Sequence, residues 1–276
     1  MLIKTGFELV FDTPNPTAMV LLLHIHPERA GSLRQPDELT LEPDLERVEF
    51  LDAFGNRATR VLTRPGRNRF WSECLVEDTG LPDPVATEAV EVPVELLPPE
   101  THQFLLASRY CEADALADLA WRLFGNGPTG GARVHAVCDW VHNELTFDYQ
   151  HARPTKTACD ALSERKGVCR DFTHVAIALC RALNIPARYA TGYLGDIGIP
   201  PAPFPMDFSA WFEAYVGHRW YTFDARHNVP RIGRIVMARG RDAADTALTT
   251  SFGPARLDGF RVWTDEVASP AHAGIL

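Results

Sequence analysis

Cys169 stands where a thiol could become a nucleophile. It follows Gly167 and Val168, at the end of one predicted helix, and opens another that we expect over about 169–183. Unpaired backbone N–H groups and the positive dipole end at a helix N-terminus both favour the thiolate, the form that attacks carbonyl carbons. A thiol at this position could equally pack as a small buried apolar side chain. The setting makes Cys169 the candidate nucleophile.

The other cysteines and two closely spaced histidines carry weaker signals. Six cysteines in 276 residues are too few for a disulfide scaffold, and they show neither a C-x-x-C pair nor zinc spacing. His24 and His26 share one face of a predicted strand, but no third ligand is evident, so we interpret them as surface or core histidines. The sequence has no glycine-rich phosphate loop. We therefore expect neither a metal nor another cofactor.

Two predicted strands follow Cys169 at an informative spacing. The first begins Ser209-Ala210-Trp211, 40 residues after Cys169, and the second ends Trp-Tyr-x-Phe-Asp at Asp224, 55 residues after it. A tight turn joins them as a hairpin. Together with the G-V-C-R-D helix start, this pattern resembles the transglutaminase-like superfamily of papain-related cysteine enzymes, in particular its bacterial transglutaminase-like cysteine protease group.

The resemblance implies a mechanism and assigns residues to it. In the family, a cysteine attacks an amide or ester carbonyl and forms a thioester. A histidine on the first strand takes the thiol proton and passes it to the leaving amine, and an aspartate on the next strand orients that histidine. The matching positions are Cys169 for the nucleophile and Asp224 for the orienting carboxylate, while Trp211 and Glu213 match residues that support the motif structurally. Tyr149 and Trp211 are candidates for binding an oxyanion or lining the cleft, and the implied partner is a peptide or protein substrate.

The general-base position of the family is occupied by Ser209. The family has His-Ala-Trp there, and a serine hydroxyl cannot act as a base near neutral pH. Other histidines are poorly placed: His174 lies about 140° around its helix from the cysteine, and His218 sits in the hairpin turn. His227 would leave the opposite face if the strand continues past Asp224, although the strand could end first. We expect no imidazole to replace the missing one, so the chain should be inactive or severely impaired, and Ser209→His should complete a triad.

The elements that must position these residues change along the chain. Residues 1–97 alternate short apolar runs with turns, as in a β-sandwich, with strands expected at 7–11, 18–26, 48–51, 58–62, 70–76 and, as an edge strand, 90–94. Helical spacing follows and strands then return, with helices expected at 115–124, 134–141, 157–166 and 169–183, and strands at 187–193, 209–216, 219–225 and 234–238.

This order predicts an α+β fold. We divide the chain into an N-terminal β-sandwich-like domain, residues 1–97, and a second domain, residues 98–276, in which a helix cluster packs on an antiparallel sheet before a C-terminal tail. The resemblance identifies the second domain as a papain-like transglutaminase core. In the tail, Arg239, Arg241 and Asp242 are expected to form a solvated run of charges.

Composition limits the partners. A chain with 46% hydrophobic and 23% charged residues is typical of a globular protein, and its net charge of −9 argues against a nucleic-acid-binding surface. The longest apolar stretch, residues 18–25, is far shorter than the ~20 residues that span a bilayer. The N-terminus lacks the pattern of a signal peptide. We expect a bacterial, cytoplasmic protein without nucleic-acid or membrane partners.

Three functions compete at this point. The first is a cysteine-dependent amidase, protease or acyl transferase. The second is a non-catalytic relative that keeps the fold and cleft to bind a peptide, which Ser209 favours. The third is an adaptor that acts through its β-sandwich, which an exposed apolar patch on residues 1–97 would favour. The sequence leaves the substrate, the oligomeric state and the choice between hydrolysis and transfer open.

Overall fold

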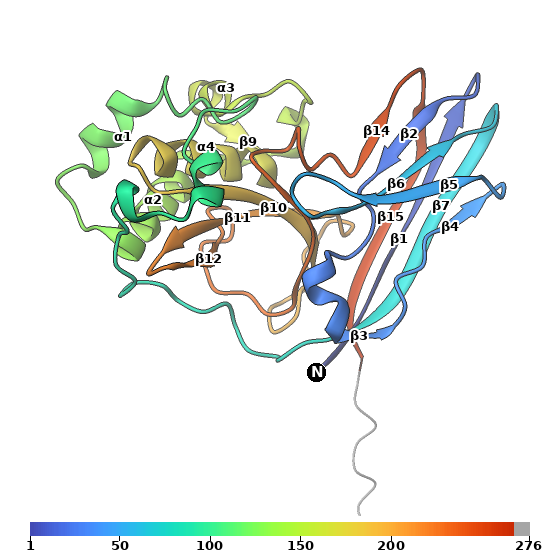
Figure 1. The fold of residues 1–276 in the computed structure, drawn as a ribbon, viewed down its shortest axis with the longest axis horizontal. Coiled ribbons are helices and arrows are strands. Elements are labelled where there is room, and N and C mark those ends of the chain that lie inside the picture. Colours follow the sequence, from blue (N-terminus) through green and yellow to red (C-terminus); the bar gives the residue numbers. More distant parts are fainter. Residues whose placement is uncertain (268–276) are drawn as a thin grey trace, which may run out of the picture.

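Three larger antiparallel sheets and a helix cluster make up residues 1–267, the part of the chain that the computed structural model describes (Figure 1). The first sheet has the order β15-β1-β7-β3, with β4 also paired to β7; its strands are β1 (Leu2–Thr13), β3 (Leu33–Gln35), β4 (Thr40–Glu42), β7 (Gly66–Glu77) and β15 (Arg256–Val267). The second has the order β14-β2-β6-β5, with strands β2 (Ala18–Leu21), β5 (Arg47–Leu51), β6 (Arg57–Leu62) and β14 (Thr249–Ser251). Side chains of both sheets share one core, so the predicted β-sandwich is confirmed.

The third sheet carries the helices. It has the order β12-β11-β10-β13, with strands β10 (Ala187–Leu194), β11 (Ser209–Val216), β12 (Arg219–Phe223) and β13 (Arg234–Gly240). Beside it lie α1 (Ala117–Phe124), α2 (Gly130–Glu144), α3 (Ala158–Glu164) and α4 (Cys169–Ala182). The remaining elements are short: η1 (Pro27–Ser32), η2 (Val94–Leu96), η3 (Pro99–Phe104), η4 (Tyr149–His151), and the parallel pair β8 (Thr146–Phe147) and β9 (Lys166–Gly167). The predicted α+β class is therefore confirmed.

Helix α4 is the centre of the second half. Residues 171–181 are all buried, because the helix packs against the other three helices on one side and against β10 and β11 on the other. A helix that is buried around its whole circumference is held rigidly by its neighbours. The position of Cys169, its first residue, is therefore fixed by the core of the molecule. None of the helices within residues 1–267 combines the length and apolar character needed to cross a membrane.

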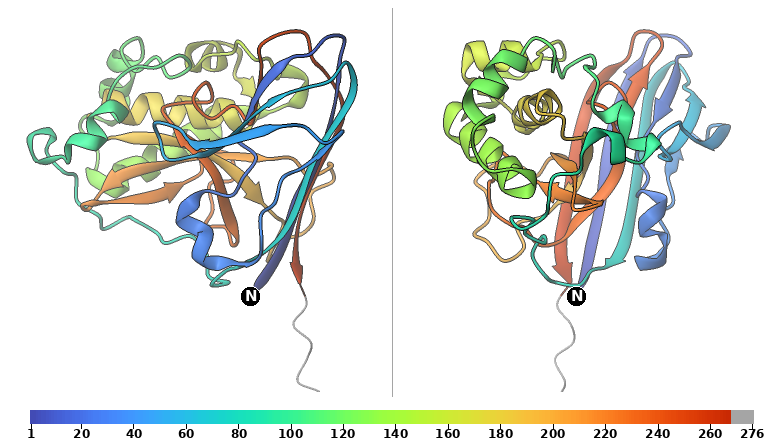
Figure 2. Two further views of the ribbon diagram at one scale, coloured as in Figure 1. Left: turned by 45° about the vertical axis from the view of Figure 1, so that its right-hand side comes forward. Right: turned by 60° about the vertical axis from the view of Figure 1, so that its left-hand side comes forward.

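The C-terminal tail returns to the N-terminal sandwich. β15 pairs with β1 along its whole length, from Leu2 opposite Val267 to Asp12 opposite Arg256, and β14 pairs with β2. Figure 2 shows the red C-terminal strand beside the blue N-terminal one in both views. The domain boundary at residue 97 stays a prediction. The predicted second domain, residues 98–276, includes the whole C-terminal tail, yet the strands of that tail, β14 and β15, pair with strands of the N-terminal sandwich. The two halves also share a core cluster, which joins Phe7 to Phe208 and Ile235.

Two other expectations were wrong in detail. Residues 90–94 do not form an edge strand: Pro93 precedes η2, and the Val90 carbonyl accepts a single bond from the N–H of Gly217 at 2.8 Å. A proline cannot donate to a strand ladder, which is the physical reason. The run at 18–26 is a strand only to Leu21, because the N–H of Ile25 binds the Asp37 carboxylate instead, at 2.6 Å.

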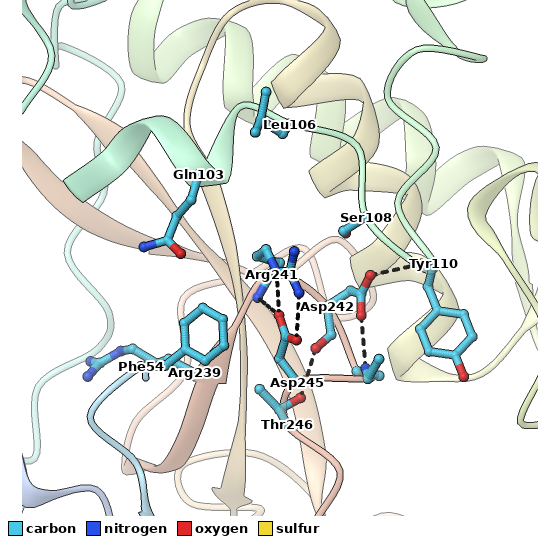
Figure 3. A network of polar contacts seen from close by, with 12 residues as sticks. Phe54, Gln103, Leu106, Ser108, Tyr110, Arg239, Arg241, Asp242, Asp245 and Thr246 are labelled. Atoms are coloured by element: carbon cyan, nitrogen blue, oxygen red, sulfur yellow. Dashed lines mark hydrogen bonds and ion pairs between the residues drawn. The ribbon is translucent and has the colours of Figure 1, made fainter. Parts of the chain in front are cut away.

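The charges near the end of β13 are not a solvated run. Asp242 is 1% exposed, and its carboxylate accepts the N–H groups of Tyr110 and Ala244, each at 2.8 Å (Figure 3). Arg239 is largely buried and binds the Glu213 carboxylate at 2.9 and 3.0 Å. Arg241 is more exposed, and it pairs with Asp245 at 2.8 Å.

Glu213 holds three strands of the third sheet together. From β11 it binds Arg188 on β10 at 2.6 Å and Arg239 on β13, and these ion pairs hold the pKa of its carboxyl below the usual range despite burial. Because the folded-state pKa is lowered, this stabilisation is present above the unfolded pKa of about 4.3 and is lost as the pH falls through the folded value.

We expect Glu213→Gln to lower the free energy of unfolding by about 3–5 kcal/mol, since two buried guanidinium groups lose their carboxylate. Urea unfolding at neutral pH measures this. The matched control is Glu49→Gln, which breaks a more exposed pair with Arg57 and should cost less than about 1 kcal/mol. Equal losses in the two variants would contradict the central role of Glu213.

Candidate active site

At the start of α4, the backbone of Val168 lies close to the side-chain carboxylate of Asp171. The N–H of Val168 donates to Asp171 at 2.9 Å, and the N–H of Asp171 donates back to the Val168 carbonyl at 2.8 Å. Gly167 lies against this pair: a Cβ there would sit 2.6 Å from the Asp171 carboxylate. The glycine is therefore needed for space, whereas the left-handed cap of the preceding helix is Arg165.

Cys169 lies at the junction of two pockets. The first, of about 200 Å³, we call the His227 pocket; it includes Tyr149, Arg226 and His227. The second, of about 570 Å³, we call the Tyr110 pocket; its lining includes Tyr110, Arg153, Arg170, Tyr189 and Phe260. Four residues line both pockets: Cys169, Asp207, Phe208 and Ser209. Two sequence-predicted positions, Cys169 and Ser209, are therefore brought together in one cleft.

The position of Cys169 at the N-terminus of α4 does not lower the pKa of its thiol. Burial raises its pKa to about 11, and the carboxylates of Asp207 and Asp224 act in the same direction. The Arg226 guanidinium and a hydrogen bond with the N–H of Ala210 act against this rise. The expected thiolate is therefore wrong for the free chain: desolvation outweighs the helix terminus. A reaction at this thiol needs a group that removes its proton.

Among the cysteines, Cys169 is still the most readily ionised. Burial raises the pKa of Cys74, Cys111, Cys159 and Cys180 to about 12. Most of these thiols are buried, as the sequence predicts. Cys169 and Cys159 are both partly exposed, and of these two Cys169 lines the cleft, so a reagent that enters the cleft reaches its thiol.

Asp224 binds an imidazole, but not from the position that the family pattern predicts. Its Oδ2 lies 2.8 Å from Nδ1 of His227 and 2.8 Å from Nη2 of Arg234. Its Oδ1 accepts the N–H groups of Arg226 and His227, both at 3.0 Å. Although Asp224 is buried, Arg234 and His227 hold its pKa well below the usual range, so it stays ionised.

The expectation that His227 faces away was wrong because β12 ends at Phe223. The chain turns directly after Asp224, and the turn brings His227 back onto that carboxylate and into the pocket that holds Cys169. An Asp-x-x-His spacing after a strand is a signal for this geometry, since aspartate side chains bind backbone N–H groups two residues on in turns. Asp207 and Arg226, which also act on the thiol, have no comparable sequence signal.

The two aromatic candidates differ in place. Tyr149 lines the His227 pocket, packs edge-on against Phe147 with ring centres 4.9 Å apart, and has its pKa raised by burial and by nearby Asp207 and Cys169. Trp211 is 2% exposed and lines neither pocket beside Cys169; its ring faces the Arg234 guanidinium at 5.1 Å. Its expected cleft role is therefore wrong, because the side chain packs into a buried cluster with Ala190 and Val236. An oxyanion role for Tyr149 stays a prediction.

The remaining histidines lie elsewhere. His174 is fully buried, stacks on Tyr110, and accepts the N–H of Ala243 at 3.2 Å. His24 and His26 are core residues, and His24 lies 2.9 Å from the Thr59 hydroxyl. Within residues 1–267, no group of three or more His, Cys, Asp or Glu side chains is placed to hold a metal ion.

Known proteins share this fold and the stretch of sequence that builds the site. The profile of the Transglutaminase-like superfamily matches residues 117–225. The crystal structure of a proposed cysteine protease from Cytophaga hutchinsonii is similar over 98% of this chain and 91% of its own, with 33% identity and a TM-score of 0.84. The chain belongs to the transglutaminase-like superfamily. The family predicted from the helix start and the two strands is therefore confirmed.

Curated relatives of this transglutaminase-like chain match over shorter stretches. An uncharacterized protein of Mycobacterium leprae is 28% identical over 117 residues, 41% of this chain and 42% of the relative. An uncharacterized protein of Mycobacterium tuberculosis is 27% identical over 176 residues, 60% of this chain and 51% of the relative. The chain thus spans about half the length of the curated relatives it matches.

We expect Asp207→Asn to make the Cys169 thiol of this transglutaminase-like chain more reactive. The carboxylate raises the thiol pKa, so its removal should shift the pH profile of iodoacetamide alkylation to lower pH and raise the rate at neutral pH several-fold. Peptide-resolved mass spectrometry measures alkylation at Cys169, and Asp196→Asn, in the same pocket, is the control. A profile that moves to higher pH would identify Asp207 as a base instead.

Proposed function

We propose that this chain is a transglutaminase-like cysteine hydrolase or acyl transferase that acts on amide bonds of peptides or proteins through a Cys169 thioester. The observation that carries the proposal is the placement of Cys169: it starts a rigid core helix and opens onto two adjoining pockets. A polypeptide crossing the cleft would place one carbonyl beside the sulfur and side chains in the pockets on either side. We also propose a cytoplasmic location.

The geometry suits acyl transfer to sulfur. In the proposed reaction, the Cys169 sulfur forms a bond to the carbonyl carbon, the carbonyl oxygen becomes an oxyanion, and the amine leaves with a proton. The Tyr149 hydroxyl is our candidate donor to the oxyanion, because Tyr149 lines the same pocket as Cys169 and its hydroxyl is protonated at neutral pH. Water or a second amine then resolves the thioester, which distinguishes a hydrolase from a transferase.

Two observations favour the second candidate, a non-catalytic peptide-binding relative. Ser209 occupies the strand position of the family histidine, and the Cys169 thiol stays protonated near neutral pH. On the strand position alone, the chain is predicted to be inactive or severely impaired. The adaptor hypothesis has its own support, because the edge strand β5 exposes Val48, Phe50 and Leu51.

The enzyme proposal predicts a covalent intermediate. With p-nitrophenyl acetate, we expect a burst of nitrophenolate and one acetyl group on the peptide that contains Cys169, removable by hydroxylamine. Cys169→Ala should abolish the burst, whereas Cys159→Ala, which removes the other partly exposed thiol, should leave it unchanged. A folded wild-type chain that carries no acetyl group on Cys169 would favour the peptide-binding relative.

A further inference from the structure

We propose that His227 supplies the imidazole that Ser209 lacks, so that the catalytic triad is Cys169, His227 and Asp224. The acid-base group then comes from the turn after β12 and not from the start of β11. This inference rests on the proposed function, since it assigns the proton transfers of the same reaction. It replaces the expectation of an inactive chain with that of a working one.

The Asp224 carboxylate orients the ring of His227. Its Nδ1 lies 2.8 Å from Oδ2 of the ionised Asp224, which fixes the ring and leaves Nε2 as the nitrogen available for proton transfer. Among residues 1–267, the His227 ring makes its hydrogen bond through Nδ1, and Nε2 has no partner there. The side chain is 22% exposed, and it lines the same pocket as Cys169 and Ser209.

The turn that carries His227 is anchored on several sides. Asn228 has a left-handed backbone, donates its N–H to the Asp224 carbonyl at 2.8 Å, and donates its side-chain amide to Asp139 at 2.7 Å. The carbonyl of Arg226 lies 2.9 Å from Nδ1 of His142 on α2, so this ring nitrogen donates to it. Because the residues on both sides of His227 are held in this way, the turn keeps the backbone of His227 in place, as a catalytic base requires.

A small residue at position 209 fits this arrangement. Phe212 on β11 lies opposite Phe223, the last residue of β12. If this register is continued by one residue, Trp211 comes opposite Asp224, and Ser209 becomes the diagonal neighbour of Asp224 on the same face. A histidine at position 209, as in the family pattern, would use the same carboxylate. Because Oδ2 already accepts from His227, a second imidazole would compete for it. Serine leaves the space free.

The proposed steps balance without any further reactant. Nε2 of His227 takes the proton from the Cys169 sulfur, and the thiolate bonds to the substrate carbonyl carbon. The same Nε2–H then passes the proton to the amine nitrogen as the C–N bond breaks. The thioester and a neutral amine remain, and Asp224 stays ionised throughout while it stabilises the transient imidazolium.

Several charged groups surround this histidine. The carboxylate of Asp224 binds its ring, and Arg234 binds the same carboxylate. Asp207, Arg226 and Arg231 line the pocket that the ring shares with Cys169. The pH dependence of Cys169 acylation should therefore change when His227 is removed.

The test measures the rate of Cys169 acetylation by p-nitrophenyl acetate against pH in the full chain. We expect His227→Ala and His227→Gln each to lower the rate at neutral pH by roughly 10²-fold or more. Added imidazole should restore part of the rate in His227→Ala, and Ser209→His in the same background should restore it more fully. His102→Gln, a histidine outside the cleft, is the matched control.

The outcomes separate this inference from the proposed function. Acetylation of Cys169 at the wild-type rate in both His227 variants would overturn the role of His227 and leave the enzyme proposal standing. A wild-type chain that is never acetylated at Cys169 would overturn both. Circular dichroism and urea unfolding of each variant establish that it is folded, and rescue by imidazole is a response that a purely structural histidine would not give.

Discussion

The buried carboxylate of Asp224 is the charge around which the site is organised. Removing a carboxylate from water costs several kcal/mol unless charges and hydrogen bonds compensate it. Here Arg234 supplies the opposite charge, the N–H groups of Arg226 and His227 supply hydrogen bonds, and Asp83 in turn holds Arg234 at 2.7 Å. One charge thereby fixes the end of β12, the turn after it, β13 and the segment that leads from the sandwich to the helices.

Much of the frame follows from local sequence patterns. Three of the helices, α1, α3 and α4, and the hairpin of β11 and β12 were predicted close to their observed bounds, because their apolar periodicity is strong and their ends carry clear signals. α2 begins earlier and ends later than its apolar residues indicate. The capping box of α3 is one example: Thr157 and Asp160 exchange bonds of 3.2 and 3.3 Å. The spacing between Cys169 and the two strands then identified the family, because the fold of the core brings residues at these spacings together in one site.

The remainder depends on long-range contacts that no local pattern encodes. β14 and β15 pair with strands more than 200 residues away, and β15 exposes most of its side chains, so it lacks the apolar signal of a core strand. The raised pKa of Cys169 arises from burial by distant segments. The placement of His227 turned on where β12 ends, and strand ends are the least certain part of a sequence prediction.

The position of the imidazole in this cleft is set by its hydrogen bond to the Asp224 carboxylate. Which backbone element carries the imidazole matters less. One ring nitrogen must contact Asp224 and the other must face the sulfur. The family pattern puts this imidazole at position 209 on β11, whereas in this chain the imidazole on the carboxylate comes from position 227 on the turn. Because Oδ2 already binds Nδ1 of His227 and Nη2 of Arg234, it has little capacity for a second imidazole. In the arrangement we propose, Ser209 and His227 therefore depend on each other: the small side chain on the strand leaves space for the imidazole of the turn.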